Sequence, residues 1–141
     1  MFGTIEIDIE IPVYPERIYR AWLDSFEHAQ FTHKPARIEA KEGGSFWALD
    51  GRVWGRLHRI VPYNHITQSW QVQDEPVSAD SSIEIRIEPT CTGSLFRVWH
   101  HGVKVESAKA MIGWWEVNYL RPLQDYFEAL VGDYIADLSD G

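Results

Sequence analysis

The chain lacks the features by which a sequence marks a secreted or membrane-spanning protein. It holds a single cysteine among 141 residues, so it forms no internal disulfide and suits a reducing compartment. No stretch approaches the roughly 20 apolar residues that a membrane span needs. The first residues also show no basic segment followed by an apolar one, as a signal peptide would. We therefore expect a cytoplasmic location.

Basic residues are also few. The 13 Lys and Arg residues are outnumbered by 21 Asp and Glu, which gives a formal net charge of −8, and they are dispersed along the chain. A nucleic-acid surface needs clustered basic side chains that displace counterions from phosphates, so we exclude this class of partner. With 45% hydrophobic and 24% charged residues, the composition is that of an ordinary globular chain. The length predicts one domain over residues 1–141, with its own core.

Motifs that carry chemistry are absent. The sequence contains no GxGxxG, GxxxxGK[ST], HExxH, GxSxG or paired CxxC pattern. His28 and His33 are spaced poorly for a shared metal, and we interpret both as surface histidines. Cys91 has no basic neighbour to lower its pKa, so we expect a small buried residue and not a nucleophile. We predict no metal and no cofactor, assign no catalytic residue, and consider a binding protein more plausible than an enzyme.

The N-terminal part predicts one strand followed by two short helices. Residues Thr4–Ile11 alternate between isoleucine and acidic side chains, which is typical of a strand with one buried face. Pro15 suits the first position of a helix that continues to about Trp22. Asp24 or Ser25 can cap a second helix over Phe26–Phe31.

Six further strands are predicted from Ala36 onward, at Arg37–Lys41, Ser45–Leu49, Arg52–Val61, Ile66–Val72, Ser82–Glu88 and Leu95–Val103. The segment between the fourth and fifth of these, Asp74–Asp80, reads as a polar loop. If the turn before Ile66 has four residues, Arg59 faces Gln68 across the hairpin and lies on the inner side.

A hairpin centred on Asp50-Gly51 brings two tryptophans together. An Asp-Gly pair between alternating runs is a strong turn signal, and its register pairs Trp47 with Trp54. The same register pairs Phe46 with Gly55, on the opposite face. An exposed tryptophan pair would suit a homodimer interface, unless Leu49 and Arg56 cover it.

The C-terminal run Ser107–Leu138 predicts one long helix, bent at Pro122. At helical spacing its apolar residues form a broad stripe, and the carboxylate of Glu116 lies in the middle of that stripe. The stripe consists of Ile112, Leu120, Leu123, Phe127, Leu130 and Tyr134. Such a helix needs a concave apolar partner. We therefore predict an α+β fold, in which a bent antiparallel sheet of about seven strands wraps around the helix and often leaves an internal pocket.

This order of elements resembles a known superfamily. The segments that carry the resemblance are Val13–Trp22, Gly43–Phe46, Asp50–Gly55, Ile60–Pro62, Gln68–Trp70 and Gly113–Trp115. They are similar to the START-like (SRPBCC, helix-grip) superfamily, and within it to the domain of the activator of the ninety-kilodalton heat-shock protein ATPase. The resemblance implies a helix-grip fold with a hydrophobic cavity, in proteins that bind lipids or polyketides, act as cyclases or activate chaperones. Glu116 departs from it, because an apolar residue would ordinarily stand there.

The strand parities place four polar side chains inside the predicted sheet: Arg59, Gln68, His100 and Glu116. In one interpretation they hold the polar end of a small apolar ligand. In another they are core groups that satisfy one another or reach solvent. In a third, Glu116 or His100 is a general acid or base. The predicted ligand cavity is lined by Phe46, Gly55, Leu57, Arg59, Gln68, Trp70, Ile83, Ile85, Phe96, Val98, His100, Ile112, Glu116 and Leu120.

Three functions remain open at this point. The first is a protein that binds a small hydrophobic or aromatic molecule, such as a lipid, in an internal cavity. The second is an interaction module for a chaperone ATPase. The third is a cyclase, dehydratase or hydrolase that acts on a polyketide-like substrate.

Overall fold

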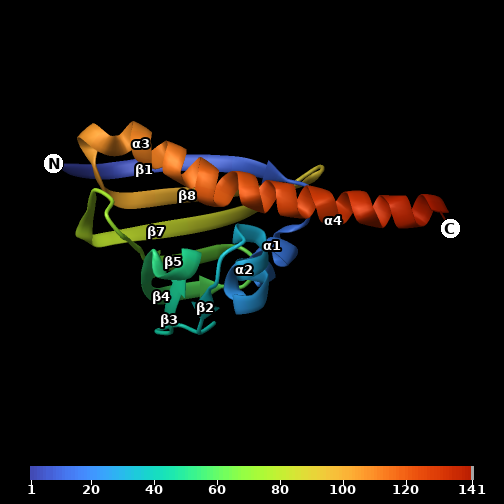
Figure 1. The fold of residues 1–141 in the computed structure, drawn as a ribbon, viewed down its shortest axis with the longest axis horizontal. Helices are drawn as coiled ribbons and strands as arrows, with labels where there is room; N and C mark the ends of the chain where they lie inside the picture. The colour runs from blue at the N-terminus through green and yellow to red at the C-terminus, as the bar shows by residue number, and fades with distance from the viewer. Residues whose placement is uncertain (141) are drawn as a thin grey trace.

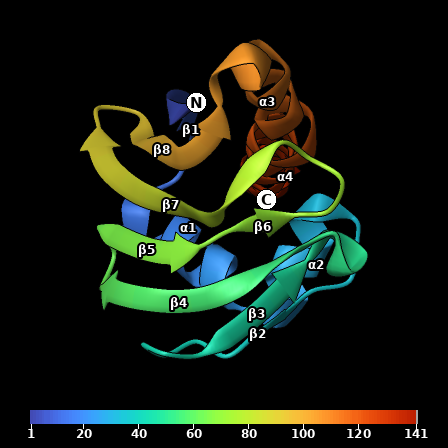
Figure 2. The same cartoon turned by 90° about the vertical axis from the view of Figure 1, so that its left-hand side faces the viewer.

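A bent antiparallel sheet wraps around a long C-terminal helix, with two short helices closing one end (Figures 1 and 2). The computed structural model describes the backbone of residues 1–140 and the side chains of residues 1–138. This is the predicted helix-grip architecture. The strands are β1 (Phe2–Ile11), β2 (Arg37–Ile38), β3 (Ser45–Ala48), β4 (Val53–Val61), β5 (His65–Ser69), β6 (Gln71–Val72), β7 (Val77–Thr90) and β8 (Gly93–Lys104).

The sheet has eight strands in the order β1-β8-β7-β5-β4-β3-β2, and β6 pairs with β4 off this path. The eighth strand arises because the predicted strand Ile66–Val72 divides at Trp70 into β5 and β6. β8, the last strand in the chain, lies between β1 and β7. Ile7 and Ile85 flank Val98 in register, and all three side chains are buried on the concave face.

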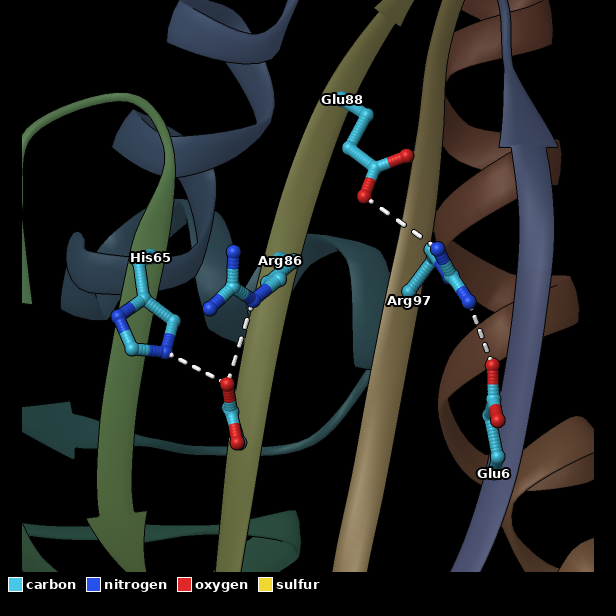
Figure 3. A network of polar contacts seen from close by, with 6 residues as sticks. Glu6, His65, Arg86, Glu88 and Arg97 are labelled. Carbon is cyan, nitrogen blue, oxygen red and sulfur yellow. Dashed lines mark hydrogen bonds and ion pairs between the residues drawn. The ribbon is translucent and has the colours of Figure 1, made fainter.

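The opposite face of these strands carries charges that pair across the strands (Figure 3). Arg97 of β8 donates to Glu6 of β1 at 2.6 Å and to Glu88 of β7 at 3.4 Å. Arg97 thus lies among acidic side chains of both neighbouring strands. Glu84 of β7 accepts from His65 of the neighbouring β5 and from Arg86 of its own strand.

The two short helices are α1 (Pro15–Leu23) and α2 (Ser25–Thr32). Asp24 caps α2, because its carboxylate accepts the backbone N–H of Glu27 at 2.8 Å. Arg17 of α1 forms a two-pronged ion pair with Glu27, which also accepts the hydroxyl of Tyr126 at 2.6 Å. The Arg17 guanidinium lowers the pKa of Glu27, and the cluster ties both short helices to the long one.

The first hairpin has the predicted register, with Trp47 opposite Trp54 and Phe46 opposite Gly55. The connection is longer than the predicted two-residue turn, since Leu49 also takes a positive φ of 51°. Gly55 is required by packing. A Cβ atom there would lie 2.3 Å from the carbonyl oxygen of Ser69 on the neighbouring strand.

The second hairpin corrects the predicted register. Val61 pairs with His65 and Leu57 pairs with Gln68, with an irregularity between Leu57 and Arg59. The turn is one residue shorter than expected. The β-bulge between Leu57 and Arg59 shifts the alternation of side chains along β4, so that Leu57 points into the core. Arg59 is therefore exposed and does not face Gln68. The strand β7 also begins at Val77, inside the predicted Asp74–Asp80 loop.

The long helix is not a single regular helix. It consists of α3 (Ala108–Trp115), a π-helical turn η3 (Glu116–Leu120) and α4 (Arg121–Asp140). In η3 the N–H of Arg121 bonds to the carbonyl of Glu116, five residues back. The turn ends two residues before Pro122, whose missing N–H and ring disfavour a regular helical turn at this point.

This turn overturns the predicted phase at Glu116. One inserted residue rotates the preceding helix by about 100° relative to α4. The face that α3 buries is therefore defined by Met111 and Trp115, and Glu116 is exposed to solvent. Beyond the sheet, α4 projects outward (Figure 1), so the predicted stripe residues Leu130 and Tyr134 are 40% and 64% exposed.

The buried face of α4 gives a stability prediction. Leu123→Ala and Phe127→Ala should each lower the free energy of unfolding by about 2–5 kcal/mol, because both side chains are fully buried and truncation leaves a cavity. Leu130→Ala is the matched control and should change stability by less than about 1 kcal/mol. Urea unfolding at equilibrium measures all three. Equal stabilities for Phe127→Ala and the control would mean that α4 does not complete the core.

Candidate functional site

Most of the predicted cavity residues lie in the interior, but two do not. Ten have buried side chains, Gly55 and Ile112 are partly buried, and Arg59 and Glu116 are exposed. The polar interior predicted from four side chains is therefore reduced to Gln68 and His100. The buried ones are Phe46, Leu57, Gln68, Trp70, Ile83, Ile85, Phe96, Val98, His100 and Leu120.

An aromatic stack fills the centre of the grip between sheet and helix. The Trp70 ring lies 5.1 Å from that of Trp115, 5.5 Å from that of Phe46 and 6.1 Å from that of Trp22, in each case nearly parallel. Trp70 and Trp115 are fully buried, and Trp22 is 2% exposed. Tyr119 packs edge-on against Trp70 at 5.5 Å. These rings occupy the space in which the sequence predicts a ligand.

The interior polar groups serve the buried indoles. Trp22 donates its Nε1–H to Gln68 Oε1 at 3.0 Å, and Trp115 donates its own to His100 Nδ1 at 3.0 Å. Because indole nitrogen only donates, Nδ1 of His100 must be the unprotonated nitrogen. Its Nε2–H then donates to Ser81 Oγ at 2.7 Å. Gln68 and His100 are thus core groups that supply hydrogen-bond acceptors for the buried indole N–H groups of Trp22 and Trp115.

His28 is a third member of this interior that the sequence interpretation misplaced on the surface. It is 2% exposed. Its Nδ1–H donates to the carbonyl oxygen of Trp22 at 2.8 Å, and its Nε2 accepts the hydroxyl of Tyr119 at 3.0 Å. The available signal was Phe31, three residues on, because residues at this spacing share one face of a helix.

Both buried histidines are held neutral. Burial lowers the pKa of His28 to about 4, and burial together with the adjacent His101 lowers the pKa of His100 to about 4. Burial also raises the pKa of the Tyr119 hydroxyl. Protonation of either histidine would remove an acceptor on which Trp115 or Tyr119 depends.

Stability should therefore fall in mild acid. The unfolded chain protonates these histidines near 6.5 and the folded protein near 4, so the unfolded state binds more protons between these values. Stability is then full above about pH 6.5 and lost as the pH falls towards 4, by on the order of 2–3 kcal/mol for each histidine. Urea unfolding across this range measures the slope.

A pair of variants separates the contribution of the buried histidines to this pH dependence from the contribution of other titrating groups. His100→Gln should flatten the pH dependence, whereas His33→Gln, at an exposed position, should leave it unchanged. A stability that is equal at pH 4.5 and pH 7 would contradict the assignment of neutral, buried histidines.

One buried polar atom in the stack has no partner within the described residues. It is Nε1 of Trp70, at the centre of the rings. An unsatisfied buried N–H costs about 1–3 kcal/mol, so this atom marks the point in the interior where an additional acceptor would be stabilised.

Among the described residues, pockets lie outside the grip, and the three best formed include none of the fourteen predicted lining residues. One, of about 580 Å³, lies where the start of α1 meets the β7–β8 turn and is bordered by Arg17, Arg20 and Cys91. Cys91 is exposed, contrary to the prediction of a buried residue. The others, of about 500 and 520 Å³, lie against α4 near Tyr126 and between α1 and Ala40.

The outer face of β3 and β4 carries the predicted tryptophan pair. Trp47 is 38% exposed and Trp54 is 44% exposed, so Leu49 and Arg56 do not cover them. Leu49 is itself buried. The paired strands therefore expose a large aromatic area.

Over residues 1–138, whose side chains are described, no group of three His, Cys, Asp or Glu side chains could hold a metal ion. No helix in the described part of the chain is long and apolar enough to cross a membrane.

The concave sheet that grips a C-terminal helix defines a protein of the START-like, helix-grip class. Within it, residues 12–128 match the model of the Activator of Hsp90 ATPase homolog 1-like protein family, and the chain belongs to that family. The activator of 90 kDa heat shock protein ATPase homolog 1 from Homo sapiens is 39% identical over 62 residues, which are 44% of this chain and 18% of that protein. The chain thus spans only a small part of the length of this curated relative.

Solved structures share the fold. An Hsp90 activator from Plasmodium falciparum superposes with a TM-score of 0.73 at 19% identity, covering 92% of this chain and 96% of that one. An Aha1 dimer from Colwellia psychrerythraea also has a TM-score of 0.73, at 17% identity, with 89% of this chain and 96% of that chain covered.

Proposed function

We propose that this chain is an interaction module that binds a chaperone ATPase of the Hsp90 class through its surface. One observation carries the proposal: the interior that a carrier of apolar molecules would keep open is filled by the stack of Trp22, Trp70 and Trp115. With the inside given over to packing, recognition falls to the outside of the molecule. Membership of the activator family supplies the class of partner. Such a partner would place the protein in the cytoplasm.

The geometry gives little support to catalysis. His100 is fully buried, and both of its ring nitrogens are engaged by Trp115 and Ser81. Glu116 lies in solvent on the far side of the helix. A general acid or base must reach the proton it transfers, and neither side chain offers that reach.

The direct test is the ATPase rate of the purified Hsp90-class chaperone from the same organism, titrated with this protein. We expect saturable binding and a changed ATPase rate, measured against an equal concentration of serum albumin. A complex seen by sedimentation that leaves the ATPase rate unchanged would support an interaction module that does not activate. No complex at any concentration would overturn the proposal.

A second candidate, the binding of a small aromatic or apolar molecule, is favoured by the unpartnered Nε1 of Trp70. A ligand with a carbonyl or ether oxygen would satisfy that donor if the stack opened. Native mass spectrometry of freshly purified protein tests this idea. A copurified molecule at one per chain would establish it, and a bare chain that also fails to bind added fatty acids or aromatic probes would remove it.

A further inference from the structure

The outer face of β2, β3 and β4 presents a compact patch of two tryptophans and two arginines. Arg37 pairs with Trp47, and Trp47 pairs with Trp54, so these three side chains form one cross-strand row on a single face. Arg56 lies two residues beyond Trp54 and shares that face. We call these four residues the Trp–Arg patch. Both arginines are exposed.

The two arginines of this patch have no acidic partner within the part of the chain that the structure describes, unlike the arginines of β7 and β8. Arg86 and Arg97 are paired with glutamates on the same sheet (Figure 3). Within the described residues, no carboxylate lies within ion-pair distance of Arg37 or Arg56. Arg56 donates only to the backbone carbonyl of Gly43, at 3.2 Å. The guanidinium groups are therefore available to an external acceptor.

The charge around the patch opposes that of the rest of the chain. Residues 34–59 hold six of the 13 basic residues and only three of the 21 acidic ones, within a chain of net charge −8. Contrary to the expected dispersal along the chain, nearly half of the basic residues fall within the one stretch that carries the patch. Of the three acidic residues, Glu39 accepts the hydroxyl of Ser45 at 2.8 Å.

This charge distribution selects the occupant. Two copies that met through the same patch about a twofold axis would bring their unpaired arginines together, and like charges oppose such a contact. An acidic segment with an aromatic or apolar side chain satisfies both features: its carboxylates meet Arg37 and Arg56, and its apolar group covers the indoles. Exposed Trp and Arg are the residue types that most often dominate binding energy.

We infer that the Trp–Arg patch is the surface on which this protein docks its chaperone, and that it recognises there an acidic segment that carries an aromatic or apolar side chain. The inference rests on the proposed function and specifies the site and chemistry of the interaction. It also replaces the predicted homodimer at this face by a different occupant.

The test uses the purified full-length Hsp90-class chaperone as the probe and measures its dissociation constant for matched variants. Trp54→Ala and the double variant Arg37→Glu/Arg56→Glu should each weaken binding by about tenfold or more. Phe26→Ala and Arg121→Glu are the controls, since both residues are exposed and lie on α2 and the long helix. Both controls should bind as the wild type does. Thermal melts confirm that every variant is folded.

Salt supplies an independent reading. Raising NaCl from about 50 to about 500 mM should weaken the wild type markedly and the charge-reversed variant hardly at all. If the patch variants bind the chaperone as tightly as the wild type does, the assignment of this face is overturned and the proposed function stands. Absence of wild-type binding would overturn both. Sedimentation that shows a dimer lost on Trp54→Ala would assign the face to a second copy and overturn the acidic partner.

Discussion

The structure depends on the burial of three indole rings at one point between sheet and helix. Trp22 comes from α1, Trp70 from the break between β5 and β6, and Trp115 from the end of α3, so the stack joins three distant segments of the chain. Large aromatic side chains contribute much of a core's apolar burial, but each indole also brings an N–H that must find an acceptor. Gln68 and His100 supply two of these acceptors, which explains why polar side chains stand at these buried positions.

The helix adapts to this stack. Trp115 at the end of α3 and Leu123 and Phe127 in α4 must all point toward the sheet. A regular helix does not place these three side chains on one face. The π-helical turn at Glu116–Leu120 corrects the phase, and Pro122 fixes its place because a regular helix is weakest there. The same turn moves Glu116 to solvent. A carboxylate that looks buried by periodicity is therefore accommodated without a partner.

The fold was largely accessible from the sequence, because period-two alternation, an Asp-Gly turn and a long apolar helix are local signals. The register of Trp47 and Trp54 follows from them. The interior was less accessible. A bulge near Arg59 and a π turn at Glu116 each shift the side-chain phase by one residue, and nothing in the spacing of apolar residues marks either one. His28 was missed because its partner, Tyr119, lies 91 residues away.

The filled interior and the exposed tryptophans have a common origin in the register of one hairpin. Alternation along β3 and β4 sends Phe46 inward onto Trp70, across from the bare backbone of Gly55, and sends Trp47 and Trp54 outward. A shift by one residue would exchange the two faces, placing indoles against the stack and Phe46 in solvent. The packing of the core thus holds the outer aromatic pair in position. Binding through this pair loses little conformational entropy, because the packed core already holds its strands in place.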